Sequence, residues 1–401
     1  MIVLALNCGS SSVKFRVFEI GTGPRPTSSL IAKGLVERIG GEAVVNAETA
    51  GEPAERENRA IPDHAAAVQW VVDRVRQTAP ALDAVGHRVV HGGERYTSSV
   101  MIDPAVDTAI QALEALAPLH NGPNLAGVRA CRAALGPSVP MVAVFDTAFH
   151  ATIPEHAHRY AVPYELSLRH GLRRFGFHGI SYQFVVPRFA ELAGVEIADA
   201  TLVAFHLGNG ASVAAVRHGQ SIDTSMGFTP LEGLVMGTRS GDLDPALVGH
   251  LARVEGVSVD VVEQWLNDRS GLAGISGGTR DMRDLIARRE GDARARLAVE
   301  MFCYRARKYL GAYLAALGGA RAVVFTGGIG ENSPDVRAGI CQGMEWCGLA
   351  LDPSRNDGAR GRESRISASG ARIEAWVIPT DEELVIAREA ARCAAGAGRA
   401  S

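Results

Sequence analysis

The sequence predicts an α/β protein built from two related halves. Short apolar segments typical of strands alternate with longer segments whose apolar residues recur at helical spacing, which is the pattern of α/β layers. Two segments about half the chain apart, Leu6–Val13 and Leu207–Val213, both run from an apolar strand through a small polar loop into a second strand. The 401 residues exceed the ~250–300 at which one core usually splits, so we expect two to three domains.

Composition excludes several classes of protein. Hydrophobic residues make up 47% and charged residues 21% of the chain, a balance that excludes wholesale disorder. The net charge of −3 leaves no basic surplus of the kind that nucleic-acid binders carry. No segment approaches the ~18 uncharged apolar residues of a membrane span. The six cysteines form no CxxC pair and no Cys/His spacing suited to a zinc site. Scattered free thiols of this kind are typical of proteins in a reducing compartment. We expect a cytoplasmic protein that binds neither nucleic acid nor membrane.

The first half opens with a predicted hairpin. Ile2–Leu6 is apolar and Val13–Phe18 alternates at period two, which predicts two strands joined by a small polar loop. Residues 21–60 are punctuated by Gly and Pro and favour short edge strands and loops. Asp63 suits the N-cap of a helix whose valines form one apolar stripe. The other elements expected here are a strand over 84–90, a helix opening at Asp103-Pro104, a helix over about 122–135 and a strand over 139–145.

The strongest helical pattern of the second half lies over 291–317 and ends at Gly318-Gly319. A strand is expected directly after it, over 322–325. The apolar residues that recur near helical spacing in this helix are Leu297, Met301, Tyr304, Leu310 and Leu314.

Three loops of small residues each follow an apolar strand, at 7–12, 208–212 and 326–332. Gly, Ser and Asn let backbone N–H groups approach phosphate oxygens closely. Each loop taken alone is more typical of a tight turn than of a phosphate site, but three together favour a phosphate site. None fits the P-loop or the Rossmann fingerprint.

Seven segments in order along the chain resemble the acetate kinase family. They cover most of the chain from residue 7 to about 385, with departures from the family pattern at Ile180, Tyr182, Asp381 and Gly122-Pro123. The segments are Asn7–Phe15, His87–Gly93, Phe145–His150, Phe175–Gly179, His206–Gly210, Met236–Asp242 and Thr326–Asn332.

The resemblance implies a duplicated actin/hexokinase/Hsp70-like fold of the ribonuclease H-like ATPase class, with two domains around a nucleotide cleft. It implies a first domain over 1–148 that regains a C-terminal helix over about 384–401. The second domain, 149–383, would carry the adenosine loop. The resemblance also implies a homodimer.

The implied reaction is ATP-dependent phosphorylation of acetate to acetyl phosphate and its reverse, by direct in-line transfer to a carboxylate. A carboxylic acid is already ionised at pH 7, so the acceptor needs no general base. The reaction needs positive charge where two anions meet, which guanidinium groups supply. The alternatives are a propionate-preferring kinase of the same family, a phosphoanhydride hydrolase on the same fold and a nucleotide-switched binding module.

Four residues of these motifs are expected to carry the chemistry. Taken alone, Arg88 and Arg239 suit surface or ion-pair roles, His178 suits a core histidine, and Asp146 suits a helix cap as well as a site. The resemblance implies that the two arginines bind the substrate carboxylate and the transferring phosphoryl group. It also implies that His178 donates to the transition state and that Asp146 orients an arginine or the metal shell.

The resemblance also assigns binding residues. It places the methyl group of the acid, whose carboxylate Arg88 binds, against Val90, Leu119, Phe177 and Pro230. It assigns Asn7 and Glu382 to a magnesium ion, or manganese in its place, although alone they suit a turn residue and a first-turn helix glutamate. ATP or ADP is the other substrate. The expected nucleotide-binding residues are Ser10, Ser12, Lys14, His206, Leu207, Gly208, Asn209, Gly210, Asp281, Met282, Arg283, Gly327, Gly328, Ile329, Gly330 and Glu331.

Among these nucleotide residues, three have plain structural alternatives. Lys14 alternates along a strand and suits a solvent-facing position. Asp281 suits a helix N-cap, and Arg283 suits an exposed position on the same helix.

Overall fold

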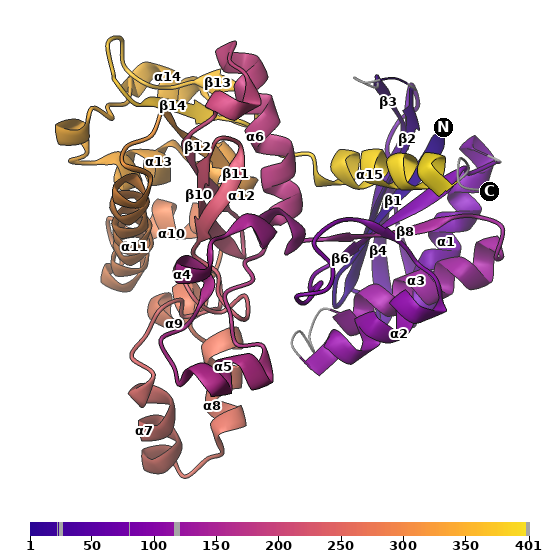
Figure 1. The fold of residues 1–401 in the computed structure, drawn as a ribbon, viewed down its shortest axis with the longest axis horizontal. Coiled ribbons are helices and arrows are strands. Elements are labelled where there is room, and N and C mark those ends of the chain that lie inside the picture. Colours follow the sequence, from indigo (N-terminus) through magenta and orange to yellow (C-terminus); the bar gives the residue numbers. More distant parts are fainter. Residues whose placement is uncertain (22, 24–26, 80, 116–120, 398–401) are drawn as a thin grey trace. The chain divides into compact units, whose positions relative to one another are not determined.

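The computed structural model describes residues 1–21, 23, 27–79, 81–115 and 121–397. It divides into two compact units, each built on one mixed sheet (Figure 1). Unit 1 comprises Met1–Phe149 and Asp381–Ser401, and unit 2 comprises His150–Thr380.

The sheet of unit 1 has the order β5-β4-β3-β2-β1-β6-β8-β7. The hairpin expected at the N-terminus is present, because β1 pairs antiparallel with β2, and β1 also pairs parallel with β6. The strands are β1 (Ile2–Cys8), β2 (Ser12–Ile20), β3 (Ser28–Glu37), β4 (Gly41–Thr49), β5 (Glu55–Ile61), β6 (Ala84–Val89), β7 (Val100–Met101) and β8 (Met141–Phe145).

The prediction of short edge strands and loops over 21–60 was wrong in its lengths. The strands β3, β4 and β5 form a continuous antiparallel meander of ten, nine and seven residues. Gly40, Gly51 and Pro53 lie in the turns between these strands, so most of the punctuation marks strand ends. Gly34 lies inside β3, where a Cβ would stand 2.4 Å from the Phe15 ring.

Helices cover both faces of this sheet (Figure 1). The helix α1 (His64–Thr78) starts as predicted, because the Asp63 side chain accepts from the Ala66 amide at 2.8 Å, and its four valines are buried. It packs with α2 (Pro104–Ala112) and α3 (Asn121–Leu135) on one face. On the other face lies α15 (Glu382–Ala397), which approaches β6 so closely that a Cβ at Gly86 would stand 2.5 Å from Ile386 Cγ2.

Unit 2 repeats the central topology of unit 1. Its sheet has the order β11-β10-β9-β12-β14-β13. The strand β9 pairs antiparallel with β10 and parallel with β12, as β1 does with β2 and β6, and the next strand on each side also matches in direction. The duplicated fold predicted from the two hairpins is thus confirmed. The strands are β9 (Leu202–Leu207), β10 (Ala211–Arg217), β11 (Gln220–Thr224), β12 (Ala322–Thr326), β13 (Ser364–Arg365) and β14 (Glu374–Val377).

The sheet of unit 2 is covered by α6 on one face and by α11 on the other (Figure 1). The helices of this unit are α4 (Glu155–His158), α5 (Tyr164–His170), α6 (Gly179–Ala193), α7 (Ala246–Glu255), α8 (Val259–Asp268), α9 (Gly271–Ser276), α10 (Met282–Arg288), α11 (Ala293–Leu317), α12 (Gly327–Asn332), α13 (Pro334–Cys341) and α14 (Pro353–Gly358).

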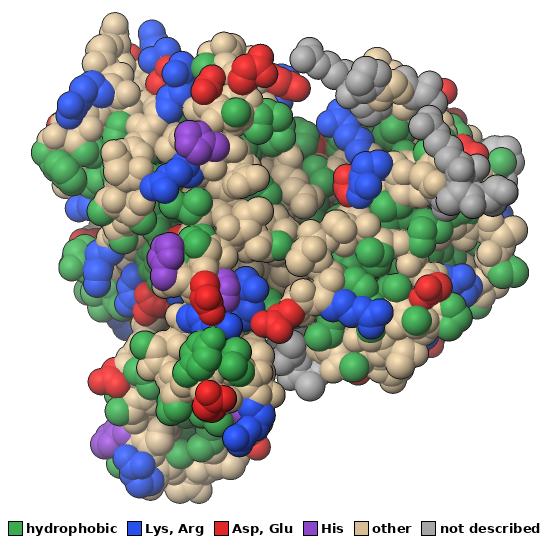
Figure 2. All heavy atoms as spheres, viewed as in Figure 1, with side chains coloured by type: hydrophobic (Ala, Val, Ile, Leu, Met, Phe, Trp, Pro, Cys, Tyr) green, Lys and Arg blue, Asp and Glu red, His purple; other side chains and the backbone are tan. Residues whose placement is uncertain are grey.

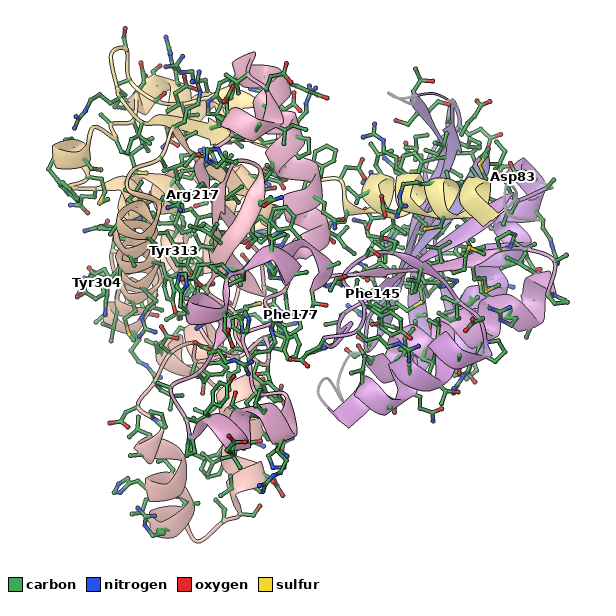
Figure 3. The ribbon with its side chains drawn as sticks, viewed as in Figure 1. Asp83, Phe145, Phe177, Arg217, Tyr304 and Tyr313 are labelled. Atoms are coloured by element: carbon green, nitrogen blue, oxygen red, sulfur yellow. The ribbon has the colours of Figure 1, made fainter. Side chains whose placement is uncertain are left out.

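The buried face of α11 differs from the apolar stripe seen in the sequence. Leu310 and Leu314 are buried, but Tyr304 is 62% exposed and Leu297 and Met301 are also exposed. Figure 3 shows Tyr304 directed away from the sheet and Tyr313 directed toward it. Small residues make up much of the buried face in the first half of the helix. Because small residues are only weakly hydrophobic, they leave a weak periodic pattern in the sequence. This face comprises Ala295, Ala298, Val299, Phe302, Cys303, Ala306, Leu310, Tyr313, Leu314 and Leu317.

The segment 326–332 is not the loop that its glycines predicted. Residues 327–332 form the short helix α12, with Thr326 as its N-cap. Glycines at the point where a strand ends and a helix starts can serve close packing as well as a turn. Composition alone does not distinguish these two uses of glycine.

Three further observations concern the described residues as a set. No helix in these ranges is both long and apolar enough to span a bilayer. All six cysteines are free. On the face shown in Figure 2, basic and acidic side chains are interspersed within each unit.

A buried histidine in unit 1 predicts a loss of stability in acid. Burial lowers the pKa of His87 to about 3, and Arg132 acts in the same direction. Between pH ~6.5 and pH 3 the unfolded chain therefore binds one more proton than the folded chain, so stability falls as pH falls. From pH 7 to pH 5 this histidine is expected to cost about 2 kcal/mol.

We expect His87→Leu to remove that part of the pH dependence, measured by urea unfolding at pH 7 and pH 5. His156→Gln, which replaces an exposed histidine, serves as the control and should keep the wild-type difference. Parallel stability curves for His87→Leu and the wild type would contradict the assignment.

Candidate active site

Three neighbouring parallel strands of unit 1 end at one cluster of polar side chains. Leu6 pairs with His87, and Val89 pairs with Phe145, so the residues that follow meet at one edge of the sheet. This register brings together Asn7, Arg88 and Asp146. The Arg88 guanidinium donates to Asp146 Oδ2 from Nε at 2.9 Å and from Nη2 at 2.5 Å, and to Asn7 Oδ1 from Nη1 at 3.1 Å.

The Arg88–Asp146 pair is partly removed from water. The Asp146 side chain is only 1% exposed and that of Arg88 21%. Desolvation opposes the charged form of Arg88, but the charges of Asp146 and Glu382 outweigh it, so the pKa of Arg88 lies above its ordinary value. Asp146 therefore orients an arginine, one of the two roles that the sequence suggested.

The start of α15 adds carboxylates to this cluster. Asp381 caps the helix by accepting from the Leu384 amide at 3.0 Å. Desolvation raises the pKa of Glu382 to about 7, with Arg88 opposing and Asp146 and Glu383 adding to the rise. Glu383 is buried and its Oε1 lies 2.9 Å from Lys14 Nζ. The Lys14 side chain is therefore half-exposed, as its strand position indicated, and is also ion-paired.

The oxygen atoms of this cluster fit a divalent cation of the magnesium type. Asp146 Oδ1 is a buried oxygen with no hydrogen-bond partner among the described residues. Asn7 Oδ1 and the Glu382 carboxylate are further hard donors. No group of three or more His, Cys, Asp or Glu in the described ranges forms a ready-made metal cage. Magnesium does not require one, since it keeps several waters and binds through one or two protein oxygens plus phosphate.

The first hairpin is braced by two asparagines that sequence reasoning missed. Asn124, on α3, accepts from the Val90 amide at 3.0 Å and donates to the Cys8 carbonyl at 2.7 Å. Asn121 makes the corresponding pair of bonds to the backbone of His91. Both asparagines are buried on a helix face that is otherwise apolar, and a polar residue at such a position was the available signal.

The hairpin loop itself is short and exposed. The Gly9 amide donates to the Ser12 carbonyl at 2.8 Å, and the Gly9 carbonyl lies 2.6 Å from His64 Nε2. Ser10 is exposed and Ser12 is partly exposed. These two hydroxyl side chains are accessible to a ligand, whereas the strands on either side are buried.

The second hairpin gathers two histidines in unit 2. His178 Nδ1 lies 2.9 Å from Ser212 Oγ, and His206 Nδ1 lies 2.8 Å from Ser181 Oγ. The two imidazole rings stack with centroids 4.1 Å apart. His178 holds φ at 57°, a left-handed conformation that is strained for a residue with a side chain and that often marks a functional site.

Arg239 joins His178 at the glycines of this hairpin. A Cβ at Gly210 would stand 3.4 Å from both Arg239 Nη1 and His178 Nε2. A Cβ at Gly208 would stand 3.8 Å from His206 Nε2. The Asn209 carbonyl accepts from the Gly237 amide at 2.9 Å, which attaches the arginine-bearing segment to the hairpin. The sequence-predicted residues of the second hairpin are thus brought together with Arg239 and His178.

The residues expected to surround the methyl group lie in both units. Val90 is buried in unit 1. In unit 2 Phe177 is buried, and the Pro230 carbonyl accepts from Arg239 Nη1 at 3.3 Å. Leu119 lies outside the described residues.

The late glycine segment is organised by Glu331. Its Oε1 accepts from the Gly327 amide at 2.9 Å and from the Thr380 amide at 3.2 Å. Gly328 is exposed, Ile329 is partly exposed, and Gly330 is buried. The Glu331 side chain therefore caps α12 and ties it to the chain that leaves unit 2.

The 281–283 segment lies at the start of α10 and keeps its structural roles. Asp281 caps the helix by accepting from the Arg283 amide at 2.8 Å, and Met282 is buried. The Arg283 side chain is 89% exposed and pairs with Asp281 at 2.6 Å. At the far end of α10, Arg289 pairs with Asp335 of α13 at 2.8 Å, which links α10 to the helix that follows α12.

Gly327 is expected to tolerate no side chain. Its φ is +76°, and a Cβ would stand 2.8 Å from the backbone N and O of Leu207. The left-handed conformation alone costs about 1–2 kcal/mol for alanine. Gly327→Ala should therefore lower the melting temperature and raise the KM for the nucleotide, measured by thermal unfolding and steady-state kinetics.

Gly328→Ala is the matched control for stability, because a Cβ there meets nothing within 4 Å and the φ of Gly328 lies outside the left-handed region. We expect that variant to keep the wild-type melting temperature. Equal melting temperatures for both variants would show that the contact between Gly327 and Leu207 is unimportant.

Comparison with known proteins identifies the family. Residues 2–388 match the acetokinase family. The acetate kinase of Solibacter usitatus is 50% identical over 410 residues that cover 99% of either chain. Two solved structures cover 98% of this chain and 99% of their own: the acetate kinase of Porphyromonas gingivalis (41% identical, TM-score 0.89) and a propionate kinase from Francisella tularensis (38% identical, TM-score 0.90). The order of the seven motifs, the repeated sheets and these likenesses agree, and the chain belongs to the acetokinase family.

Proposed function

We propose that the chain transfers the γ-phosphoryl group of ATP to acetate, forming acetyl phosphate and ADP, and catalyses the reverse reaction. The observation that carries this proposal is the convergence of Arg239 Nη1 and His178 Nε2 on the backbone of Gly210. That arrangement places a permanent cation and an imidazole beside a glycine hairpin. The curated relatives that cover the chain from end to end are acetate kinases.

The transfer needs no general base for its acceptor, because acetate is already ionised at pH 7. A carboxylate oxygen of acetate attacks the γ-phosphorus in line, and the bond from that phosphorus to the ADP oxygen breaks as the new P–O bond forms. Arg239 and His178 stabilise the charge on the equatorial oxygens. Arg88, which is oriented by its hydrogen bonds to Asp146, binds the acetate carboxylate and fixes its position. Asn209, Gly208 and the N–H groups of the hairpin position the phosphates.

Asn7 and Glu382 are the residues that would hold magnesium, with Asp146 beside them. A magnesium ion held there would supply positive charge that neutralises the phosphates. The protein side chains keep that region desolvated and preorganised. Manganese, which also prefers oxygen ligands, would fit the same donors.

The acid preference is acetate, with propionate as the alternative. One methylene in an apolar pocket changes binding by only ~1–3 kcal/mol, so neighbouring acids compete closely. The likeness to a propionate kinase of 38% identity supports keeping this alternative. Hydrolysis of phosphoanhydrides, the other alternative, would not depend on the acid at all.

Trapping the product with hydroxylamine tests the proposal. The acyl hydroxamate is measured with acetate, propionate and butyrate, each with and without magnesium. We expect the highest kcat/KM with acetate and no product without the metal. A propionate optimum would favour the alternative kinase, and phosphate release that persists without any acid would favour the hydrolase.

We further propose that the protein is a cytoplasmic homodimer. The six free cysteines support a reducing compartment. Sedimentation at micromolar concentration tests the oligomeric state, and a monomer would contradict the proposal.

A further inference from the structure

The segment from Ser225 to Asp242 carries both Pro230 and Arg239 but contains no helix and no strand. An arginine that must meet a transferring phosphoryl group needs a fixed position, since small displacements cost rate. Backbone hydrogen bonds hold the part around Arg239, through Met236, Gly237 and Thr238. The first part, 225–232, is held by neighbouring side chains as well. We propose that Arg174, with Glu232 and Tyr160, is the positioning centre that fixes Pro230 and Arg239. This inference rests on the proposed function for its effect on turnover.

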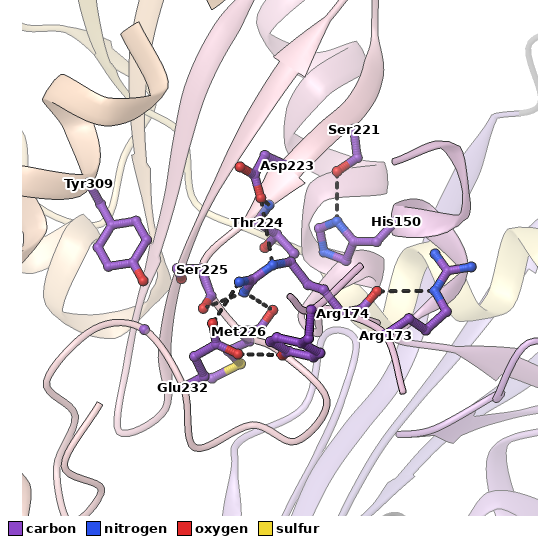
Figure 4. Close-up of polar contacts among 12 residues, drawn as sticks. His150, Arg173, Arg174, Ser221, Asp223, Thr224, Ser225, Met226, Glu232 and Tyr309 are labelled. Atoms are coloured by element: carbon purple, nitrogen blue, oxygen red, sulfur yellow. Dashed lines mark hydrogen bonds and ion pairs between the residues drawn. The ribbon is translucent and has the colours of Figure 1, made fainter. Parts of the chain in front are cut away.

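The Arg174 guanidinium forms hydrogen bonds to both ends of the first part of the segment, 225–232 (Figure 4). Arg174 Nη1 donates to the carbonyls of Ser225 and Met226, each at 3.2 Å. Arg174 Nη2 donates to Glu232 Oε1 at 2.6 Å. The start and the end of the stretch 225–232 are therefore tied to the same planar group.

Tyr160 adds a second bridge inside the stretch. Its hydroxyl donates to Glu232 Oε2 and accepts from the Phe228 amide at 2.8 Å. Pro230, which lies between these two points, accepts from Arg239 Nη1 at 3.3 Å. Hydrogen bonds therefore run from Arg174 through Glu232 and Tyr160 to the Phe228 amide, two residues along the backbone from Pro230, whose carbonyl bonds to Arg239.

The same anchor reaches His178. The amides of Phe175 and Gly176, which follow Arg174, donate to the Gly227 carbonyl at 3.0 and 3.3 Å. His178 comes two residues later in its strained conformation. The backbone and the side chain of one short segment thus fix the two groups that converge on Gly210.

The charge balance explains why this position holds an arginine. The Arg174 side chain is 16% exposed, and desolvation opposes its charged form. Glu232, Tyr160 and Tyr313 together outweigh that effect, so the pKa of Arg174 stays above the ordinary value. Asp223 lies 3.8 Å from Arg174 Nε and adds a second negative charge. A lysine ammonium could not reach two carbonyls and a carboxylate in one plane. Since Arg174 is committed to these partners, it positions the site without touching substrate.

The test uses two mild variants, Tyr160→Phe and Glu232→Gln, and a matched control, Tyr164→Phe. The control removes a hydroxyl from a side chain that is 58% exposed in the same part of the chain. We expect both variants to lower kcat about 10–100-fold with the nucleotide KM unchanged, because a misplacement of ~1 Å costs that much. The control should keep the wild-type kcat. Melting temperatures are measured for all three.

Two readouts separate positioning from general damage. Combined with Arg239→Lys, Glu232→Gln should have little further effect on kcat, because both changes act on the same group. Hydrogen exchange of the amides over 225–242 should be faster in Tyr160→Phe than in the wild type, and exchange over 327–332 should not change.

Each outcome decides the proposal. A wild-type kcat in folded Tyr160→Phe, a fully additive effect with Arg239→Lys, or unchanged exchange over 225–242 would overturn it. If Glu232→Gln fails to fold, Tyr160→Phe decides, since it loses a single oxygen. If the wild type phosphorylates no short acid, the proposed function fails, and hydrogen exchange still tests the anchor by itself.

Discussion

Replacing Arg239 with alanine is expected to lower kcat by about 10³-fold or more, the range found when a cation is removed from a transferring phosphoryl group. Arg239 Nη1 converges with His178 Nε2 on Gly210, so the substitution removes the guanidinium from the point where these two groups meet. The hydroxamate assay with acetate and ATP measures the loss. The nucleotide KM should change little, because the residues that the resemblance assigns to the adenosine, 281–283 and 327–331, lie at the start of α10 and on α12.

The fold is expected to survive this substitution. The segment that carries Arg239 is held through its backbone, since the Leu272 amide donates to Met236 and the Ser270 amide donates to Thr238, each at 2.9 Å. Arg253→Ala, which removes an exposed arginine on α7, is the control and should keep full activity. A folded Arg239→Ala enzyme with near-normal kcat would remove Arg239 from the transfer step.

The repeated sheets and the charged residues of the candidate site were both predictable from the sequence. Two hairpins half a chain apart predicted the duplicated sheets, because apolar alternation and small polar loops are local signals. The family resemblance assigned separate site roles to Arg88, Asp146 and Asn7, and the strand register brings these three side chains together. Local patterns were enough at the two hairpins, where strand ends and short turns set the geometry, but not at 326–332, where a strand end leads into a helix.

The apolar pattern of the sequence did not predict which side chains are buried where that burial depends on packing against a neighbouring element. Leu297, Met301 and Tyr304 recur at helical spacing on α11 but are exposed, because small residues on another face, such as Ala295 and Ala298, pack inward instead. A count of apolar residues gives alanine too little weight to show this. Arg174 directly precedes the motif Phe175–Gly179, but the sequence does not show its role, since the residues to which its guanidinium donates lie 51 to 58 residues away.

Arg88→Ala is expected to reduce both turnover and stability. Loss of the guanidinium leaves the Asp146 carboxylate, 1% exposed, without the charge that compensates it. Removing one partner of a buried pair costs about 3–5 kcal/mol, and the lower end applies because Arg88 is partly solvated. A fall in kcat of about 10²–10³-fold should accompany this, since the acetate carboxylate loses its bidentate partner. Urea unfolding and the hydroxamate assay measure the two effects.

The double variant Arg88→Met/Asp146→Leu separates the two effects. An apolar pair of similar volume is often as stable as the ion pair that it replaces, because neither charge then has to be desolvated. We therefore expect the double variant to recover most of the lost stability while kcat stays as low as in Arg88→Ala. A double variant as unstable as the single one would show that the pair does not account for the loss. If activity returned together with stability, Arg88 would act only as the structural partner of Asp146 and would take no part in binding the acid.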